Sequence, residues 1–189
     1  MTDFDTQAYG PGVADLLQPR VMPLGPGVPD VKMLDKLRAM TPEQVFNGRP
    51  IFDEAMAQAA LSGIWLYHDY LDESHIISQS INTSTGSFWH GIMHRREPDY
   101  SNAKYWFRRV GRHDVFIPLA EAAAELTAET TETRLVHLTS EPAWDPFDFV
   151  DLVEKASDEG GELERLCVEI QTREWWLLFD YCWRAATGK

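Results

Sequence analysis

Proline and glycine are crowded at one end of this chain, and this distribution constrains its fold more than any other feature. The first 31 of the 189 residues contain five prolines and four glycines. Because proline disrupts a helix interior and cannot donate to a strand ladder, sustained helices and strands are excluded there. The sequence therefore predicts an arm over residues 1–31, either disordered or laid extended over the rest, and a single domain over residues 32–189.

Helix signals follow the arm along the remaining chain. Thr41-Pro42-Glu43-Gln44 combines an N-cap, a first-turn proline and a capping-box glutamine. Apolar residues at helical spacing predict further helices over 51–67, 71–81, 117–128, 145–157 and 162–186, and a helical hairpin over 87–111 that turns at Pro98-Asp99. Residues 130–140 fit either a short strand or a packed loop. We therefore predict an all-α fold, an irregular helical bundle built from repeat-like hairpins.

The composition predicts a substantial core and limits the partners. Hydrophobic residues make up 44% of the chain, and seven tryptophans are available as core anchors. The net charge of −13 argues against binding to nucleic acid or to an anionic membrane. Cys167 and Cys182 fall on one predicted helix, about 22 Å apart along its axis, which is too far for a disulfide. No secretion signal or membrane-spanning run is recognisable, so we expect a cytoplasmic protein.

Aromatic, basic and histidine side chains are concentrated in the hairpin of residues 87–111. Residues 94–112 carry six basic side chains against two acidic ones, whereas residues 120–180 carry four against sixteen. Guanidinium groups suit carboxylate and phosphate ligands. We predict a helical interaction module, without catalysis or cofactor, that binds an anionic small molecule or an acidic protein segment, with a homodimer as a possible assembly. The predicted ligand-binding residues are Trp89, His90, His94, Arg95, Tyr105, Arg108 and Arg109.

The same charges allow a purely structural interpretation. The basic hairpin could pack against the acidic C-terminal half, so that the two neutralise each other. Adjacent residues on a helix point about 100° apart. At most one arginine of each doublet, 95–96 and 108–109, is therefore expected to face a shared pocket.

A metal site is the alternative function. His90 and His94 are separated by one helical turn, a spacing that places two imidazoles on one face. A third ligand would come from the preceding helices, with His75 as our choice and His68, Asp72 and Glu73 as alternatives. Three protein ligands and an open position for water define hydrolytic zinc sites. This pattern predicts a small hydrolase that uses zinc or another divalent metal. Either histidine could instead act as a general base, oriented by a nearby carboxylate.

Two resemblances complete the sequence analysis. Gly91, the Asp99-Tyr100 turn and the apolar positions Ala103, Trp106, Phe107 and Val110 resemble tetratricopeptide and Sel1-like helical hairpins, although the internal period of 29 residues is shorter than the usual ~34. The segments HRREPDYSNAKYWFRRVGRH and EIQTREWWLLFDYC are similar to an uncharacterised all-helical protein family. That resemblance implies a helical fold and no particular activity.

Overall fold

The computed structural model describes residues 4–140 and 144–189, and these residues form helices and no strands. The predicted all-α class is therefore confirmed. A 3₁₀ helix at Thr6–Tyr9 precedes the α-helices, which are α1 (Pro11–Leu16), α2 (Leu34–Ala39), α3 (Pro42–Val45), α4 (Glu54–Tyr67), α5 (Leu71–Ser80), α6 (Ser84–Arg96), α7 (Tyr100–Val110), α8 (Phe116–Leu126), α9 (Thr133–Ser140), α10 (Pro146–Glu159) and α11 (Gly161–Thr187). None of the helices in these residues has both the length and the apolar character needed to cross a bilayer.

Side-chain caps explain where several of these helices begin. The predicted capping box of α3 is present, because Thr41 accepts from the backbone N–H of Gln44 while the Gln44 side chain accepts from that of Thr41. Thr83 and Asp99 accept backbone N–H groups at the starts of α6 and α7. These bonds satisfy donors that a helix start leaves without partners. At the other end of α7, Gly111 has φ +63°, a conformation that glycine tolerates best.

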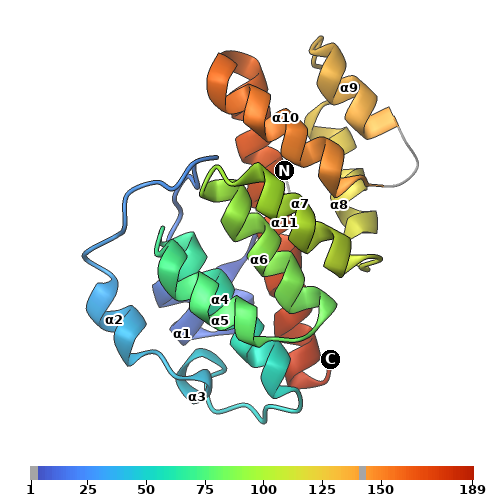
Figure 1. Cartoon of the computed structure of the whole chain (residues 1–189). Helices are drawn as coiled ribbons and strands as arrows, with labels where there is room; N and C mark the ends of the chain where they lie inside the picture. The colour runs from blue at the N-terminus through green and yellow to red at the C-terminus, as the bar shows by residue number, and fades with distance from the viewer. Residues whose placement is uncertain (1–3, 141–143) are drawn as a thin grey trace.

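The helices are arranged as antiparallel pairs around one long helix. The hairpins α4–α5 and α6–α7 pack on each other through α5 and α6, and α11 contacts α4, α8 and α10. Figure 1 shows α11 in red running the length of the bundle, with α2 and α3 along one edge and α8 to α10 at the other end. The two hairpins and α11 therefore enclose the main core.

Small residues set the spacing between the helices of this core. A Cβ added to Gly63 of α4 would lie 2.7 Å from the ring of Trp89, and one added to Gly91 would lie 3.0 Å from the ring of Phe107. The distance at Gly63 is shorter than real Cβ contacts, so a side chain there would force α4 and α6 apart, and the distance at Gly91 is tighter than most real contacts. The indole Nε1 of Trp175 donates to the Gly63 carbonyl at 2.9 Å, which ties α11 to α4 at the same level.

The N-terminal arm is packed on the bundle. Val13 and Leu17 are fully or almost fully buried in the main core. Beyond α1, residues 17–33 form no regular helix, and their carbonyl groups accept hydrogen bonds from bundle side chains. Tyr67 donates to the Gln18 carbonyl at 2.8 Å, and the His68 ring nitrogen Nε2 lies 2.7 Å from the Leu16 carbonyl. The described part of the arm lies on the bundle, but it is not extended throughout as predicted, because Thr6–Tyr9 and Pro11–Leu16 form short helices.

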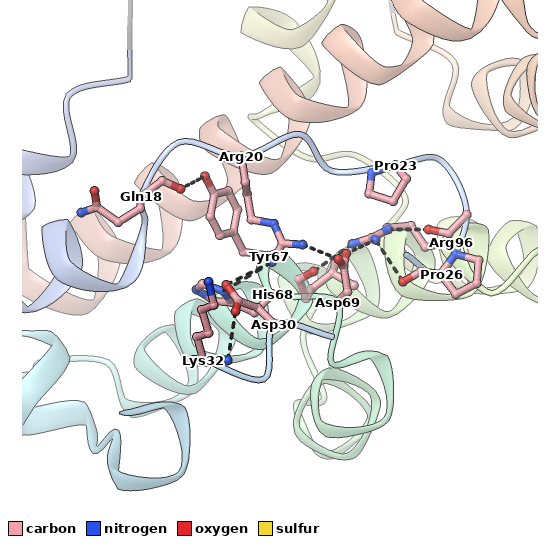
Figure 2. A network of polar contacts seen from close by, with 12 residues as sticks. Gln18, Arg20, Pro23, Pro26, Asp30, Lys32, Tyr67, His68, Asp69 and Arg96 are labelled. Atoms are coloured by element: carbon pink, nitrogen blue, oxygen red, sulfur yellow. Dashed lines mark hydrogen bonds and ion pairs between the residues drawn. The ribbon is translucent and has the colours of Figure 1, made fainter. Parts of the chain in front are cut away.

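A buried ion-pair network joins the arm to the two hairpins (Figure 2). Asp69, in the turn between α4 and α5, binds Arg20 of the arm and Arg96 at the end of α6. Arg96 also donates to the carbonyls of Gly25, Leu66 and Pro26 at 3.1, 2.8 and 3.3 Å. One carboxylate and one guanidinium group therefore hold three separate segments of the chain together.

The region 130–140 differs from both alternatives predicted for it. It contains the helix α9 instead of a strand or an irregular loop. Leu135 and Leu138 are buried in a second apolar cluster with α8, α10 and α11. Their spacing of three residues suits a helix face. Packing against α8 and α10 supplies what the local sequence signal of this helix lacks.

Replacing Asp69 tests the importance of this network. We expect Asp69→Ala to lower the free energy of unfolding by about 3–5 kcal/mol, because it leaves the buried guanidinium group of Arg96 without its counter-charge. Urea denaturation measures the change. Asp15→Ala is the matched control, since Asp15 forms an exposed pair with Lys36 at 4.0 Å and its loss should cost less than about 1 kcal/mol. Equal effects of the two substitutions would contradict this interpretation.

Candidate metal centre

Three histidines meet where α5 packs against α6. A ring nitrogen of each of His75, His90 and His94 lies within 4.8 Å of the others. The ring centroids of His75 and His90 are 4.5 Å apart, and those of His90 and His94 are 4.7 Å apart. Tetrahedral zinc with bonds of about 2.0–2.1 Å separates its nitrogen ligands by ~3.3 Å, so modest side-chain rotations would bring the three rings to an ion. The structure thus places together the three residues predicted as metal ligands.

The hydrogen bonds of His90 leave one nitrogen suited to a metal. Its Nδ1 lies 3.1 Å from the hydroxyl of Ser78, which itself donates to the backbone carbonyl of His75 at 3.3 Å. Because that hydroxyl proton is engaged, the Ser78 oxygen accepts from Nδ1–H, and Nε2 of His90 then carries the lone pair that binds metals.

His94 shows the same arrangement with a carboxylate. Its Nδ1 lies 3.0 Å from Oε2 of Glu97, so Nδ1–H donates and Nε2 carries the lone pair. Metal-binding histidines commonly have a carboxylate or carbonyl at the second nitrogen, which fixes the tautomer and increases ligand basicity. The side-chain nitrogen of Asn102 lies 3.1 Å from His94 Nε2. A bound ion would therefore displace this amide.

Burial favours the neutral form of the His90 and His94 imidazoles by lowering the pKa of each. It is the largest cause that lowers the pKa of His90, to about 3, and the charges of His94, His75 and Arg109 lower it further. Burial also lowers the pKa of His94, while Glu97 acts in the opposite direction. Neutral imidazole is the form that binds metals. At pH 7 the site therefore presents ligands without the need to release protons from His90 and His94.

One side of the site is aromatic and basic. The ring of Trp106 on α7 stacks on His90 with centroids 3.9 Å apart, and the guanidinium carbon of Arg109 lies 5.0 Å from the Trp106 ring centroid. His75, Asn102 and Trp106 are each partly exposed, so solvent reaches the site from the side formed by α5 and α7.

The rest of the predicted ligand surface is divided between the interior and the exterior. Trp89 and Arg95 are fully buried. Trp89 donates to the sulfur of Cys182 at 3.4 Å, and Arg95 binds the buried carboxylate of Glu174 and the amide oxygen of Gln171. Neither residue has exposed surface to offer a ligand. Arg95 therefore fits the interpretation that the basic hairpin and the acidic C-terminal half neutralise each other, because its partner Glu174 lies in that half.

Three predicted residues do face solvent. Tyr105 is 48% exposed, and Arg108 and Arg109 are also exposed. The two arginines point to different surroundings, because Arg108 lies over the ring of Phe147 on α10 and Arg109 over that of Trp106. This agrees with the expectation that only one member of a doublet faces a given site. The hairpin therefore does not present its basic residues as a single surface.

Comparison with known proteins adds no relative. No family model matches the chain, and no curated protein or solved structure shows significant similarity to it. The resemblance to helical repeats and to an uncharacterised helical family therefore stays a sequence-based prediction.

Sequence reasoning did not assign Asn102 or Trp106 to the site. Both lie on α7 with Arg109, at spacings of four and three residues, which places them on one helix face. That spacing was visible in the sequence. Its functional meaning was not, because only the packing of α7 against α6 shows that this face meets the histidines.

His113 provides a pH-dependent test outside the centre. Burial lowers its pKa to about 4, and its Nδ1 accepts the backbone N–H of Val115 at 3.3 Å. At pH values between about 6.5, the pKa of histidine in the unfolded chain, and about 4, the unfolded chain binds a proton at His113 and the folded chain does not. We therefore expect the free energy of unfolding to fall with acidification from pH 6.5 towards pH 4, with His113 contributing up to about 1.4 kcal/mol per pH unit.

Urea denaturation across this pH range measures the slope. His113→Leu should flatten it, whereas the same substitution at the exposed His137 should not. An unchanged slope for His113→Leu would show that this imidazole titrates normally in the folded protein.

Proposed function

We propose that this protein is a small metal-dependent hydrolase that binds zinc or another divalent metal through His75, His90 and His94. The observation that supports it is the approach of three ring nitrogens to within 4.8 Å, with Ser78 and Glu97 orienting two of the rings. Three nitrogen ligands suit zinc, copper or nickel better than magnesium or calcium, which prefer oxygen. The cytoplasmic location expected from the sequence belongs to the same proposal.

The chemistry follows from the number of ligands. Three imidazoles leave a fourth position for water, and zinc lowers the pKa of such a water to about 7. A metal ion held by His75, His90 and His94 would supply a nucleophilic hydroxide for the hydrolysis of an ester, amide or phosphate bond. In this proposal His75, His90 and His94 hold the metal ion, and Glu97 maintains the tautomer of His94.

Metal analysis of protein purified without a polyhistidine tag tests the proposal. We expect one transition metal ion per chain and, with zinc at 100 times its dissociation constant, a stabilisation of about 2.7 kcal/mol, equivalent to a Tm increase of about 5–10 °C. His90→Ala and His94→Ala should each abolish this increase. His137→Ala is the control, because His137 lies on α9 outside the cluster.

The two measurements together decide the matter. Absence of stoichiometric metal, combined with an unchanged Tm in the presence of zinc, copper or nickel, would exclude the metal centre. So would a zinc-induced stabilisation that persists in both alanine variants.

A second candidate function is binding of an anionic ligand or acidic protein segment without catalysis. It is supported by the exposed arginines at the end of α7, since no ion pair formed by the described residues includes Arg108 or Arg109. In a chain of net charge −13, cations without a carboxylate partner are available to an external anion.

A charge reversal tests this second function. The double substitution Arg108→Glu and Arg109→Glu should weaken binding to a decaglutamate peptide by at least about tenfold, without changing the helix content. Arg38→Glu is the control, because Arg38 is exposed on α2. If the native protein does not bind the peptide at physiological salt, this function is excluded.

A further inference from the structure

The arginine doublet on α7 offers a natural comparison between two neighbouring cations. Arg108 and Arg109 are both exposed and adjacent in sequence, yet they lie over different rings. Arg108 covers Phe147 of α10, with its guanidinium carbon 5.9 Å from the ring centroid. Arg109 covers Trp106, whose other neighbour is the imidazole of His90. Only Arg109 is therefore coupled to the histidine cluster.

The guanidinium group of Arg109 lies over the ring of Trp106, with its carbon 5.0 Å from the ring centroid. A cation over an indole face is attracted by the ring quadrupole, and tryptophan is the most favourable ring for this contact. None of the ion pairs among the described residues includes Arg109. Its N–H donors are therefore available to an external anion next to the ring that contacts His90.

The charges around the histidines are arranged with opposite signs on opposite sides. Glu97 Oε2 lies 3.0 Å from His94 Nδ1, and Arg109 lies over the ring of Trp106 that contacts His90. A carboxylate thus lies at the His94 end and a cation at the His90 end. A metal ion is attracted by the first and an anion by the second. The site is electrostatically suited to the two together.

We propose that Arg109, positioned by Trp106, binds the anionic group of the substrate at the histidine centre. The substrate is then a phosphate ester or a carboxylate. One oxygen of the anion would lie on the metal, and another would accept a charge-assisted hydrogen bond from the guanidinium group of Arg109. This inference rests on the proposed metal centre and names its substrate class. It also gives a role to two residues predicted from the sequence as anion ligands, His90 and Arg109, within one site.

Calorimetric titration of the zinc-loaded full chain tests the inference. Inorganic phosphate and acetate serve as separate probes, which distinguish a phosphate site from a carboxylate site. We expect saturable binding of at least one of them. Arg109→Gln should weaken it about tenfold, the equivalent of one charge-assisted hydrogen bond. Arg108→Gln is the matched control and should change the affinity less than about twofold. Arg109→Lys, which keeps the charge but lacks the planar fork, should lie between the two.

Zinc content and helicity are measured on every variant. Both should be unchanged, because Arg109 is exposed and is not a metal ligand. One zinc per chain with a phosphate and acetate affinity independent of Arg109 would overturn this inference and leave the metal centre standing. Equal weakening by Arg108→Gln and Arg109→Gln would overturn it as well, because it would indicate general surface charge. Failure of the native chain to bind zinc would overturn both.

Discussion

Asp69 lies buried between two guanidinium groups, and the arrangement of the first half of the molecule depends on this contact. Its carboxylate binds Arg20 from the arm and Arg96 from the end of α6. Without a partner, the buried charges of Asp69 and Arg96 would each be strongly unfavourable. The backbone at Asp69 has φ +63°, a left-handed conformation that is uncommon outside glycine. Packing and ion pairing together hold the turn in this conformation and bring three segments to one point.

The same contact positions the candidate centre. Arg96 ties the last turn of α6 to the α4–α5 turn and the arm, and Arg95 ties the neighbouring face of that turn to α11 through Glu174. His94 is the residue before this pair, so its imidazole is directed towards α5 and α7. The basic residues that suggested ligand binding in the sequence therefore act, in part, as internal anchors for the histidines. This is consistent with the rule that buried arginine is paired and hydrogen-bonded.

The histidine cluster combines features that single residues would not provide. Ser78 and Glu97 orient two imidazoles, burial lowers the pKa values of His90 and His94, and Trp106 contacts both His90 and the guanidinium group of Arg109. Neutral nitrogen donors next to a fixed cation suit a metal ion that carries a negatively charged ligand. The metal and anion proposals are thus two consequences of one local arrangement.

The sequence by itself determined the helices with strong local signals, because caps, breakers and apolar spacing act over about four residues. The Thr41 capping box, the Gly111 stop and the i, i+4 histidine pair were all accessible from neighbouring letters. The tertiary structure alone decided which side chains meet. Glu174 pairs with Arg95 across 79 residues, His75 instead of His68 joins the histidine pair, and α9 becomes helical through packing in the second core. These outcomes depend on the relative placement of remote helices, which is set by burial and charge pairing over the whole bundle and leaves no trace in a local pattern.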